Sequence, residues 1–393
     1  MKFMMRAAWL FGLALALAPP AFAQPGLNDS SRPGSVIVFP KFIQGTTVLP
    51  EGGTAPITEL EIGVLCPTGV TCPADFPIRI RFQWVCGATV AASTCKGTDF
   101  FVDATLNEKI ILTPNGETQN SYSSGLPTKT VPAANCPNGG GYLIGWMVNL
   151  FDLPIKFDGL IGEAHLRQGT LLGTTLAQAP SGPGNSKNKG TSPPPAATAL
   201  ASYNAIPIQA ANRDPAATGA LITISSNGGL LFDGVGNDYQ AVTGQVTGDV
   251  RYTNLTTGPT FTQGVLTLLT LDVQVNRSNN PVSVDLEFFG GNPSNIGNEN
   301  EVSTSTSFIC WEEVPIEVIQ SSLTTSLMGR EGVFLSSPAK NNSGPVTLLG
   351  LVTTLEGGVF PPTAPWPRAS ASSLFNSGVP VPTTFVSNTN TGP

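Results

Sequence analysis

The sequence predicts an all-β fold of the β-sandwich type, built as two β domains or one large β assembly with long loops and at most a short helix. Apolar and polar residues alternate with a period of two through most of the chain, which is typical of half-buried strands. The 35 prolines and 43 glycines interrupt these runs at short intervals, as turns between strands require. The chain has 393 residues, which is too long for a single small core.

The first segment, residues 1–23, has the pattern of a secretory signal peptide. Lys2 and Arg6 precede the apolar run "AAWLFGLALALA", and the tripeptide "AFA" before Gln24 is a small-x-small cleavage site. The apolar run is too short for a membrane-spanning helix, which needs about 20 apolar residues. We therefore expect a protein that is exported to the periplasm or the cell exterior and is not an integral membrane protein.

The charge balance argues against nucleic acid as a partner. Without residues 1–23, 17 Lys and Arg remain against 26 Asp and Glu, a net charge of −9. Such a chain, with no basic stripe or arm, lacks the electrostatic footprint that nucleic-acid binding requires. Charged residues make up only 11% of the chain, against about 25% in ordinary domains. This composition suits extracellular β-proteins, including those that self-associate, and self-association is one property we consider.

The first strand of the exported chain is "GSVIVFPKF", residues 34–42. Apolar side chains fall on both of its faces, so it belongs inside a sheet or between two layers. Two interpretations remain open. The segment is either the first strand of its own domain or, because it follows the flexible leader "QPGLNDSSRP", a donor strand that completes the sheet of a neighbouring subunit.

The next two strands are "ITELEIGVLC" and "IRIRFQWVC". Each alternates strictly, and each places a cysteine, Cys66 or Cys86, on its apolar face. If the two strands are antiparallel neighbours, Glu61 lies opposite Arg81 in a favourable cross-strand pair.

Further strands are predicted in "PVSVDLEFF", "GVLTLLTLDVQVN" and "STSFICWEEVPIEVI". The best helix candidate is "GLIGEAHLRQGTLLGTTLAQA", residues 159–179, although three internal glycines weaken it. Residues 179–201 begin with a stretch rich in Pro, Gly, Ser and Asn. Such a stretch has too little apolar surface to fold by burying it. We take them as a linker or long loop between an N-terminal β-sandwich domain, residues 24–178, and a C-terminal β domain, residues 202–393.

The segments "RPGSVIVFPKF", "TELEIGVLC" and "TDFFVDATLNEKIILTP" loosely resemble uncharacterised exported proteins of Gram-negative bacteria that have an immunoglobulin-like β-sandwich domain. The resemblance covers roughly the first third of the exported chain, and its motifs are short. It implies an immunoglobulin-like first domain and no particular chemistry.

An even number of cysteines in an exported chain favours disulfide bonds. The six cysteines are Cys66, Cys72, Cys86, Cys95, Cys136 and Cys310. Because two short loops can close locally, we predict the pairs Cys66–Cys72 and Cys86–Cys95, which leaves Cys136–Cys310. A zinc site is disfavoured, because no C-x-x-C motif occurs and His165 is the only histidine.

The most suggestive constellation is Trp311 followed by Glu312 and Glu313, since an aromatic ring beside carboxylates can bind a sugar. The competing interpretation is a core tryptophan beside a disulfide. His165 lacks a G-x-S-x-G partner motif and is interpreted as a surface residue. Carboxylate pairs two residues apart, such as Asp285 with Glu287, are what any half-exposed strand shows.

One loop, "FDGVGNDYQ", suggests calcium. It places Asp233, Asn237 and Asp238 among glycines, and hard cations bind several such oxygens. The competing interpretation is an ordinary turn, because Asn, Asp and Gly are the common turn residues.

Motifs of cofactor enzymes are missing from the sequence. It contains no Walker loop, G-x-G-x-x-G, C-x-x-C-H or H-E-x-x-H. No cofactor is therefore expected, and calcium is the one alternative that the composition leaves open. The sequence favours a secreted, non-enzymatic cell-envelope protein with a binding, adhesive or structural role and an unknown protein or glycan ligand. The alternative is a carbohydrate-binding or carbohydrate-active protein on a β-sandwich scaffold.

Overall fold

The computed structural model describes residues 32–44, 57–72, 78–116, 118–120, 131–137, 139–168, 198–251, 261–290, 300–316, 331–357 and 368–387. This part of the chain consists of mainly antiparallel sheets joined by loops, with a 3₁₀ turn, η2, at Pro215–Ala217. The all-β, sandwich-like prediction is confirmed, while the immunoglobulin-like type stays a prediction. The predicted signal peptide, residues 1–23, lies outside the described residues. Within those residues, no helix is long and apolar enough to cross a membrane.

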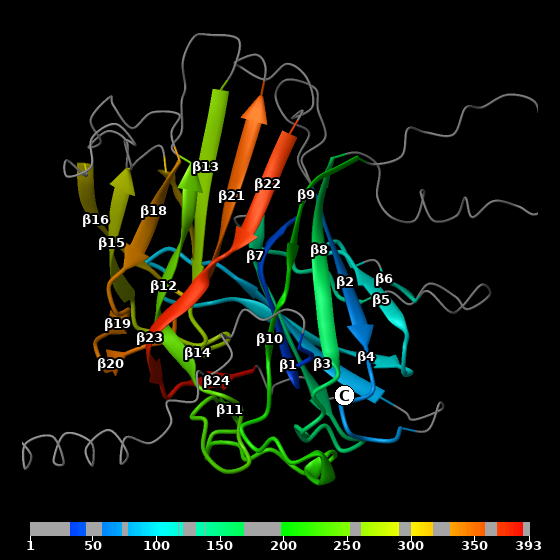
Figure 1. Cartoon of the computed structure of the whole chain (residues 1–393). Coiled ribbons are helices and arrows are strands. Elements are labelled where there is room, and N and C mark those ends of the chain that lie inside the picture. The colour runs from blue at the N-terminus through cyan, green and yellow to red at the C-terminus, as the bar shows by residue number, and fades with distance from the viewer. Residues whose placement is uncertain are drawn as a thin grey trace, which may run out of the picture.

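One five-stranded sheet, here called the central sheet, has the strand order β10-β1-β7-β3-β4 (Figure 1). Its strands are β1 (Val36–Ile43), β3 (Ile78–Cys86), β4 (Gly97–Ala104), β7 (Gly140–Val148) and β10 (Ile206–Ile208). All neighbouring pairs are antiparallel.

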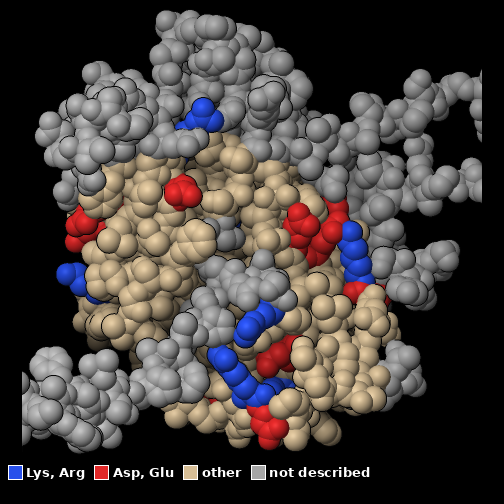
Figure 2. All heavy atoms as spheres, in the orientation of Figure 1, with Lys and Arg blue, Asp and Glu red and all other residues tan. Residues whose placement is uncertain are grey.

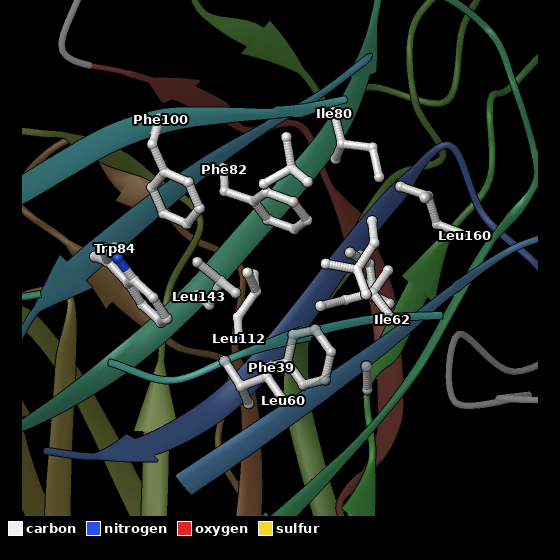
Figure 3. Packing of buried hydrophobic residues seen from close by; sticks show 14 of the residues in the cluster. Phe39, Leu60, Ile62, Ile80, Phe82, Trp84, Phe100, Leu112, Leu143 and Leu160 are labelled. Atoms are coloured by element: carbon white, nitrogen blue, oxygen red, sulfur yellow. The ribbon is translucent and has the colours of Figure 1, made fainter. Parts of the chain in front are cut away.

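A second five-stranded sheet, the flanking sheet, has the order β6-β5-β2-β8-β9. Its strands are β2 (Ile57–Val64), β5 (Lys109–Leu112), β6 (Thr118–Asn120), β8 (Leu160–Gln168) and β9 (Thr198–Asn204). Figure 3 shows side chains of the two sheets meeting in one core, which we call the first core. Its labelled members are Phe39, Leu60, Ile62, Ile80, Phe82, Trp84, Phe100, Leu112, Leu143 and Leu160.

The central and flanking sheets form the first sandwich. The second half of the chain forms the second sandwich. One sheet has the order β20-β19-β15-β18-β12-β23, with β16 paired to β15. It comprises β12 (Val242–Arg251), β15 (Val282–Gly290), β16 (Asn300–Phe308), β18 (Glu331–Ser336), β19 (Lys340–Asn341), β20 (Gly344–Pro345) and β23 (Phe375–Val381). The other sheet has the order β17-β13-β21-β22. It comprises β13 (Phe261–Leu269), β17 (Trp311–Pro315), β21 (Leu349–Gly357) and β22 (Arg368–Ser373). Their apolar faces meet in a second core.

A small three-stranded sheet completes the fold, with the order β11-β24-β14. It consists of β11 (Leu230–Leu231), β14 (Val273–Gln274) and β24 (Thr384–Val386), and the β14–β24 pair is parallel. Its side chains enter a third cluster, the junction core, which also receives residues from the central sheet. The two halves of the chain therefore share buried apolar surface.

The position of β1 explains the apolar character of "GSVIVFPKF". Val36 and Val38 face the junction core, whereas Ile37 and Phe39 face the first core, and all four side chains are fully buried. The strand pairs with β7 on one edge and with β10 on the other. It is thus an interior strand of the chain's own sheet, as the first of the two sequence interpretations predicted.

The strands on either side of the predicted linker pair with each other. After residue 197, β9 pairs with β8 and β10 pairs with β1. Residues 179–197 of the predicted linker, residues 179–201, lie outside the described residues. The division into domains at residues 24–178 and 202–393 stays a prediction, to which the structure adds the shared junction core.

Two expectations about local structure were wrong. Residues 160–168 of the helix candidate form strand β8, whose alternate residues Leu160 and Ala164 face the first core. Residues 169–179 of the candidate lie outside the described residues. The strands around Glu61 and Arg81 are not neighbours, since β2 lies in the flanking sheet and β3 in the central sheet. Glu61 instead forms an ion pair with Lys109, and Arg81 forms one with Asp99.

The six cysteines form three disulfides, as predicted, but two of the predicted pairs were wrong. The structure contains Cys66–Cys72, Cys86–Cys136 and Cys95–Cys310. Cys86 and Cys95 lie close in sequence, yet Cys86 belongs to the first core and Cys95 to the junction core. The loop between them therefore carries the chain from one core to the other, and each cysteine pairs within its own core.

Burial raises the pKa of four carboxyl groups above the ordinary range: Asp158, Asp238, Asp272 and Glu312. A carboxyl with a raised pKa binds its proton more tightly in the folded protein than in the unfolded chain. Its contribution to stability is therefore present below the unfolded pKa, about 4, and is lost as the pH rises through the folded pKa.

We expect the variant Asp272→Asn to gain stability over the native chain at pH 7 and to lose most of that gain at pH 4. In the native chain, Asn341 Nδ2 donates a hydrogen bond to the Asp272 carboxylate over 2.9 Å, and the amide oxygen of the introduced side chain can still accept it. Urea unfolding at both pH values measures the difference, and Asp249→Asn, at an exposed site, is the control. A gain equal at both pH values would contradict the prediction.

Candidate ligand-binding cleft

A cleft of about 480 Å³, here called the junction cleft, opens where the two sandwiches meet. Four segments that lie far apart in the sequence form its walls. They are Phe42 and Ile43, Ala88 to Val90, Gly139 and Gly140, and Ser307 with Trp311, Glu312 and Glu313. The sequence-predicted constellation of Trp311, Glu312 and Glu313 therefore lines a cavity, together with segments that the sequence did not connect with it.

A sharp corner between β16 and β17 places these residues. Cys310 has a φ of 64°, a left-handed conformation that lets the chain leave one sheet of the second sandwich and enter the other. Ile309 forms an isolated bridge with Ala88, and the Cys95–Cys310 disulfide ties the same corner to the opposite wall. The walls of the cleft are thus held by covalent and backbone contacts.

Trp311 is a core residue rather than an exposed sugar platform. Only 7% of its surface is accessible, and its indole Nε1 donates a hydrogen bond to the Pro40 carbonyl over 2.9 Å. A Cβ on Gly87 would lie 2.7 Å from the indole, and one on Gly140 would lie 3.0 Å from it. These glycines let the ring pack directly on the backbone, so only an edge of it reaches the cleft.

Glu313 faces the central sheet and forms an ion pair with Lys41 of β1. The Lys41 side chain is 5% exposed and the Glu313 side chain is 36% exposed. The pair crosses the junction between the two sandwiches, and it neutralises one of the two carboxylates in the cleft.

Glu312 points the other way from Glu313. Consecutive strand residues face opposite sides, and the register places Glu312 beside Leu268 and Glu313 beside Thr267. The cleft therefore wraps around the edge of β17, and the two carboxylates do not converge on one substrate atom. Burial raises the pKa of Glu312 above its ordinary value. Among the described residues, Glu312 has no hydrogen-bond or ion-pair partner.

The remaining walls combine hydroxyl groups with apolar surface. Thr89 and Ser307 contribute hydroxyls, and Val90 is 44% exposed at the opening. Gly139 has a φ of 70°, and a Cβ there would meet nothing closer than 3.9 Å. The structure thus presents a mixed surface with one carboxylate free to accept hydrogen bonds.

The loop predicted to bind calcium is a set of hydrogen-bonded turns. Asp238 is 4% exposed, and its Oδ1 accepts the Val235 amide over 2.8 Å. The Asn237 side-chain oxygen lies 3.4 Å from the Asn212 amide nitrogen. Asp233 is half-buried nearby and helps to raise the pKa of Asp238. Among the described residues, no group of three His, Cys, Asp or Glu side chains is arranged to hold a metal ion, and the calcium site stays a prediction.

His165 lies on β8, on the outer face of the flanking sheet and away from the cleft. Its Nε2 is 3.7 Å from Glu61 and 3.9 Å from Glu163. The side chain is 16% exposed, so it is more buried than the sequence suggested.

A second cavity of about 650 Å³ lies between the Cys66–Cys72 loop and the turn η2. Lys156 and Asp214 border this region, where Lys156 Nζ donates a hydrogen bond to the Asp214 carbonyl. The Asp214 carboxylate accepts the Ala216 amide as a helix cap. The charged groups of Lys156 and Asp214 are thus engaged within the fold, unlike that of Glu312.

Comparisons with known proteins leave the family open. No family model and no curated protein matches the chain. Among solved structures, the chain is similar to the crystal structure of the CupB6 tip adhesin from Pseudomonas aeruginosa, with 9% identity over 86% of this chain and 98% of that chain. The TM-score of this match is 0.12, so no property of that adhesin is carried over to this chain.

Sequence reasoning found the β17 side of the cleft and missed the other walls. In the sequence, the run from Ala88 to Val90 stands out only as part of a predicted disulfide loop. The one available signal was an ionisable residue, Lys41, inside an apolar strand, since a buried lysine needs a partner.

Proposed function

We propose that this protein is an exported, non-enzymatic binding protein of the cell envelope, which binds its ligand in the junction cleft. The observation that carries the proposal is Glu312, a half-buried carboxylate without a partner among the described residues, in the wall of a cavity of about 480 Å³. A buried polar group normally has a hydrogen-bond partner, and a ligand would supply one here.

The arrangement of the cleft favours binding over catalysis. Glycoside hydrolysis needs two carboxyl groups that flank one bond. Glu312 and Glu313 face opposite sides of β17, and Glu313 is engaged by Lys41. The three disulfides and the low charge are typical of proteins that work outside the cytoplasm, which supports the exported setting.

The test compares two valine-to-tryptophan variants of the mature protein, residues 24–393. Val90→Trp fills the opening of the cleft, and Val235→Trp adds the same side chain at a 71% exposed position elsewhere. Surface plasmon resonance against immobilised neutral polysaccharides and extended peptides measures binding. We expect Val90→Trp to weaken binding at least tenfold and Val235→Trp to leave it unchanged.

Two results would overturn the proposal. If the native protein binds no member of the panel, the binding role fails. If Val90→Trp binds as tightly as Val235→Trp, the cleft is not the binding site. Turnover of a bound polysaccharide that is lost in Glu312→Gln would instead favour the carbohydrate-active alternative.

A further inference from the structure

The charge of the cleft limits the ligands that it accepts. Lys41 neutralises Glu313, which leaves Glu312 as an unpaired carboxylate among the residues that the structure describes. A phosphate or carboxylate ligand would meet like charge in a partly desolvated site. Figure 2 shows that charged groups on the face drawn there are few and mixed in sign, so that face presents no broad patch of one charge. The cleft therefore favours a neutral ligand that donates hydrogen bonds, and a cationic ligand is the competing hypothesis.

The hydroxyl groups of the cleft continue on the surface of β16. Ser303, Ser305 and Ser307 alternate with Thr304 and Thr306 along this strand, and the three serines are exposed on one face. Ser307 also lines the cleft, so this serine row begins where the cleft ends. Four residue steps along a strand cover about 13 Å. A ligand that leaves the cleft at Ser307 therefore meets two more hydroxyls at regular spacing.

The neighbouring strand makes the same face polar. Across the pairing register, Ser307 faces Ser283, Ser305 faces Asp285 and Ser303 faces Glu287. The Ser305 hydroxyl donates to Asp285 over 2.5 Å, which orients its oxygen to accept a hydrogen bond from outside. By contrast, β18 and β23 of the same sheet expose Val333, Leu335, Phe375 and Val379. The polar face of β15 and β16 thus gives way to exposed apolar side chains on β18 and β23.

We propose that the ligand of the cleft is a neutral glycan chain, which places one sugar against Glu312 and continues along the serine row of β16. This inference rests on the proposed function and adds the ligand class and its direction. Sugar hydroxyls would donate to the Glu312 carboxylate and exchange hydrogen bonds with Ser307, Ser305 and Ser303. Val90 and the edge of Trp311 would contact the carbon faces of the ring.

The experiment is a chain-length series. Calorimetry measures the binding of neutral glucan oligosaccharides with one to eight sugars, with α and β linkages, at low and high salt. We expect affinity to rise with length and then level off, because a chain longer than the serine row gains no further contact. Salt should have little effect on a neutral ligand.

Two variants separate the cleft from the serine row. Glu312→Gln should weaken binding of every length by a similar factor. The double variant Ser303→Val/Ser305→Val should leave the shortest binding oligosaccharide unaffected and reduce affinity for long chains about 2- to 10-fold per lost hydrogen bond. Ser370→Val, at an exposed position on β22, is the matched control and should change nothing.

Each outcome distinguishes this inference from the proposed function. If affinity does not depend on oligosaccharide length while Val90→Trp still blocks binding, the serine row does not contact the ligand, and the cleft remains the binding site. Binding of oligolysine that falls steeply with salt would overturn the neutral glycan in favour of a cationic ligand. No binding of any oligosaccharide overturns this inference, and the polysaccharide and peptide panel then decides on the proposed function.

Discussion

Replacing both Cys95 and Cys310 by alanine is expected to lower the free energy of unfolding by about 2–5 kcal/mol. This disulfide joins residues 215 positions apart, so it restricts the unfolded chain far more than a short bridge does. It also fixes the corner between β16 and β17, which positions Trp311 and the carboxylates of the cleft. We therefore expect ligand binding to weaken in the same variant under conditions where it is still folded.

The matched control is the double variant Cys66→Ala/Cys72→Ala. This bridge spans 6 positions, and the loop-entropy relation gives about 2 kcal/mol for its loss, against about 5 kcal/mol for the loop of 215 positions. Urea unfolding of both variants and of the native chain measures the three stabilities. A larger loss in the short-loop variant than in the Cys95→Ala/Cys310→Ala variant would contradict this account.

The alternation of residues predicted which side chains are buried but could not predict which strands are neighbours. Leu60, Ile62, Ile80 and Phe82 all point into the first core, as the period of two indicated. The pattern is the same whether two strands lie side by side or face each other across a core. This is why the expected pair of Glu61 and Arg81 failed, and why only the structure assigns β2 and β3 to different sheets.

The disulfides show the same limit. Proximity in sequence correctly paired Cys66 with Cys72, because a loop of that length has no room to leave its core. It failed for Cys86 and Cys95, because the intervening loop crosses from one core to another. Local spacing carries no information about such a crossing.

Strand β8 shows how one pattern can fit two structures. Glycines at 162, 169 and 173 already weakened the helix expected over residues 159–179. In the structure, Gly162 lies close to Phe39, since a Cβ there would be 2.6 Å from its ring. The glycine is therefore explained by the close packing of the two sheets of the first sandwich, which only the tertiary fold reveals.

Replacing Trp311 by alanine is expected to lower the free energy of unfolding by about 3–5 kcal/mol. The ring is 7% exposed and lies in the junction core, between the backbones of Gly87 and Gly140. Its removal leaves a cavity at the point where the two sandwiches join, and the Pro40 carbonyl loses its hydrogen-bond donor. Thermal or urea unfolding of the purified variant measures the loss.

Two further variants decide whether Trp311 acts through the fold or through direct contact with a ligand. Phe375→Ala removes an aromatic ring that is 62% exposed, and it should change stability by no more than about 0.5 kcal/mol. Trp311→Phe keeps most of the ring volume and should retain both the fold and the ligand affinity of the cleft, because only an edge of the indole reaches the opening. If Trp311→Ala is no less stable than Phe375→Ala, the residue is not part of the core. If Trp311→Phe folds normally but loses ligand binding, the indole contributes more to the ligand than a contact at its edge, and the sugar-binding role predicted for it from the sequence would hold beside the structural one.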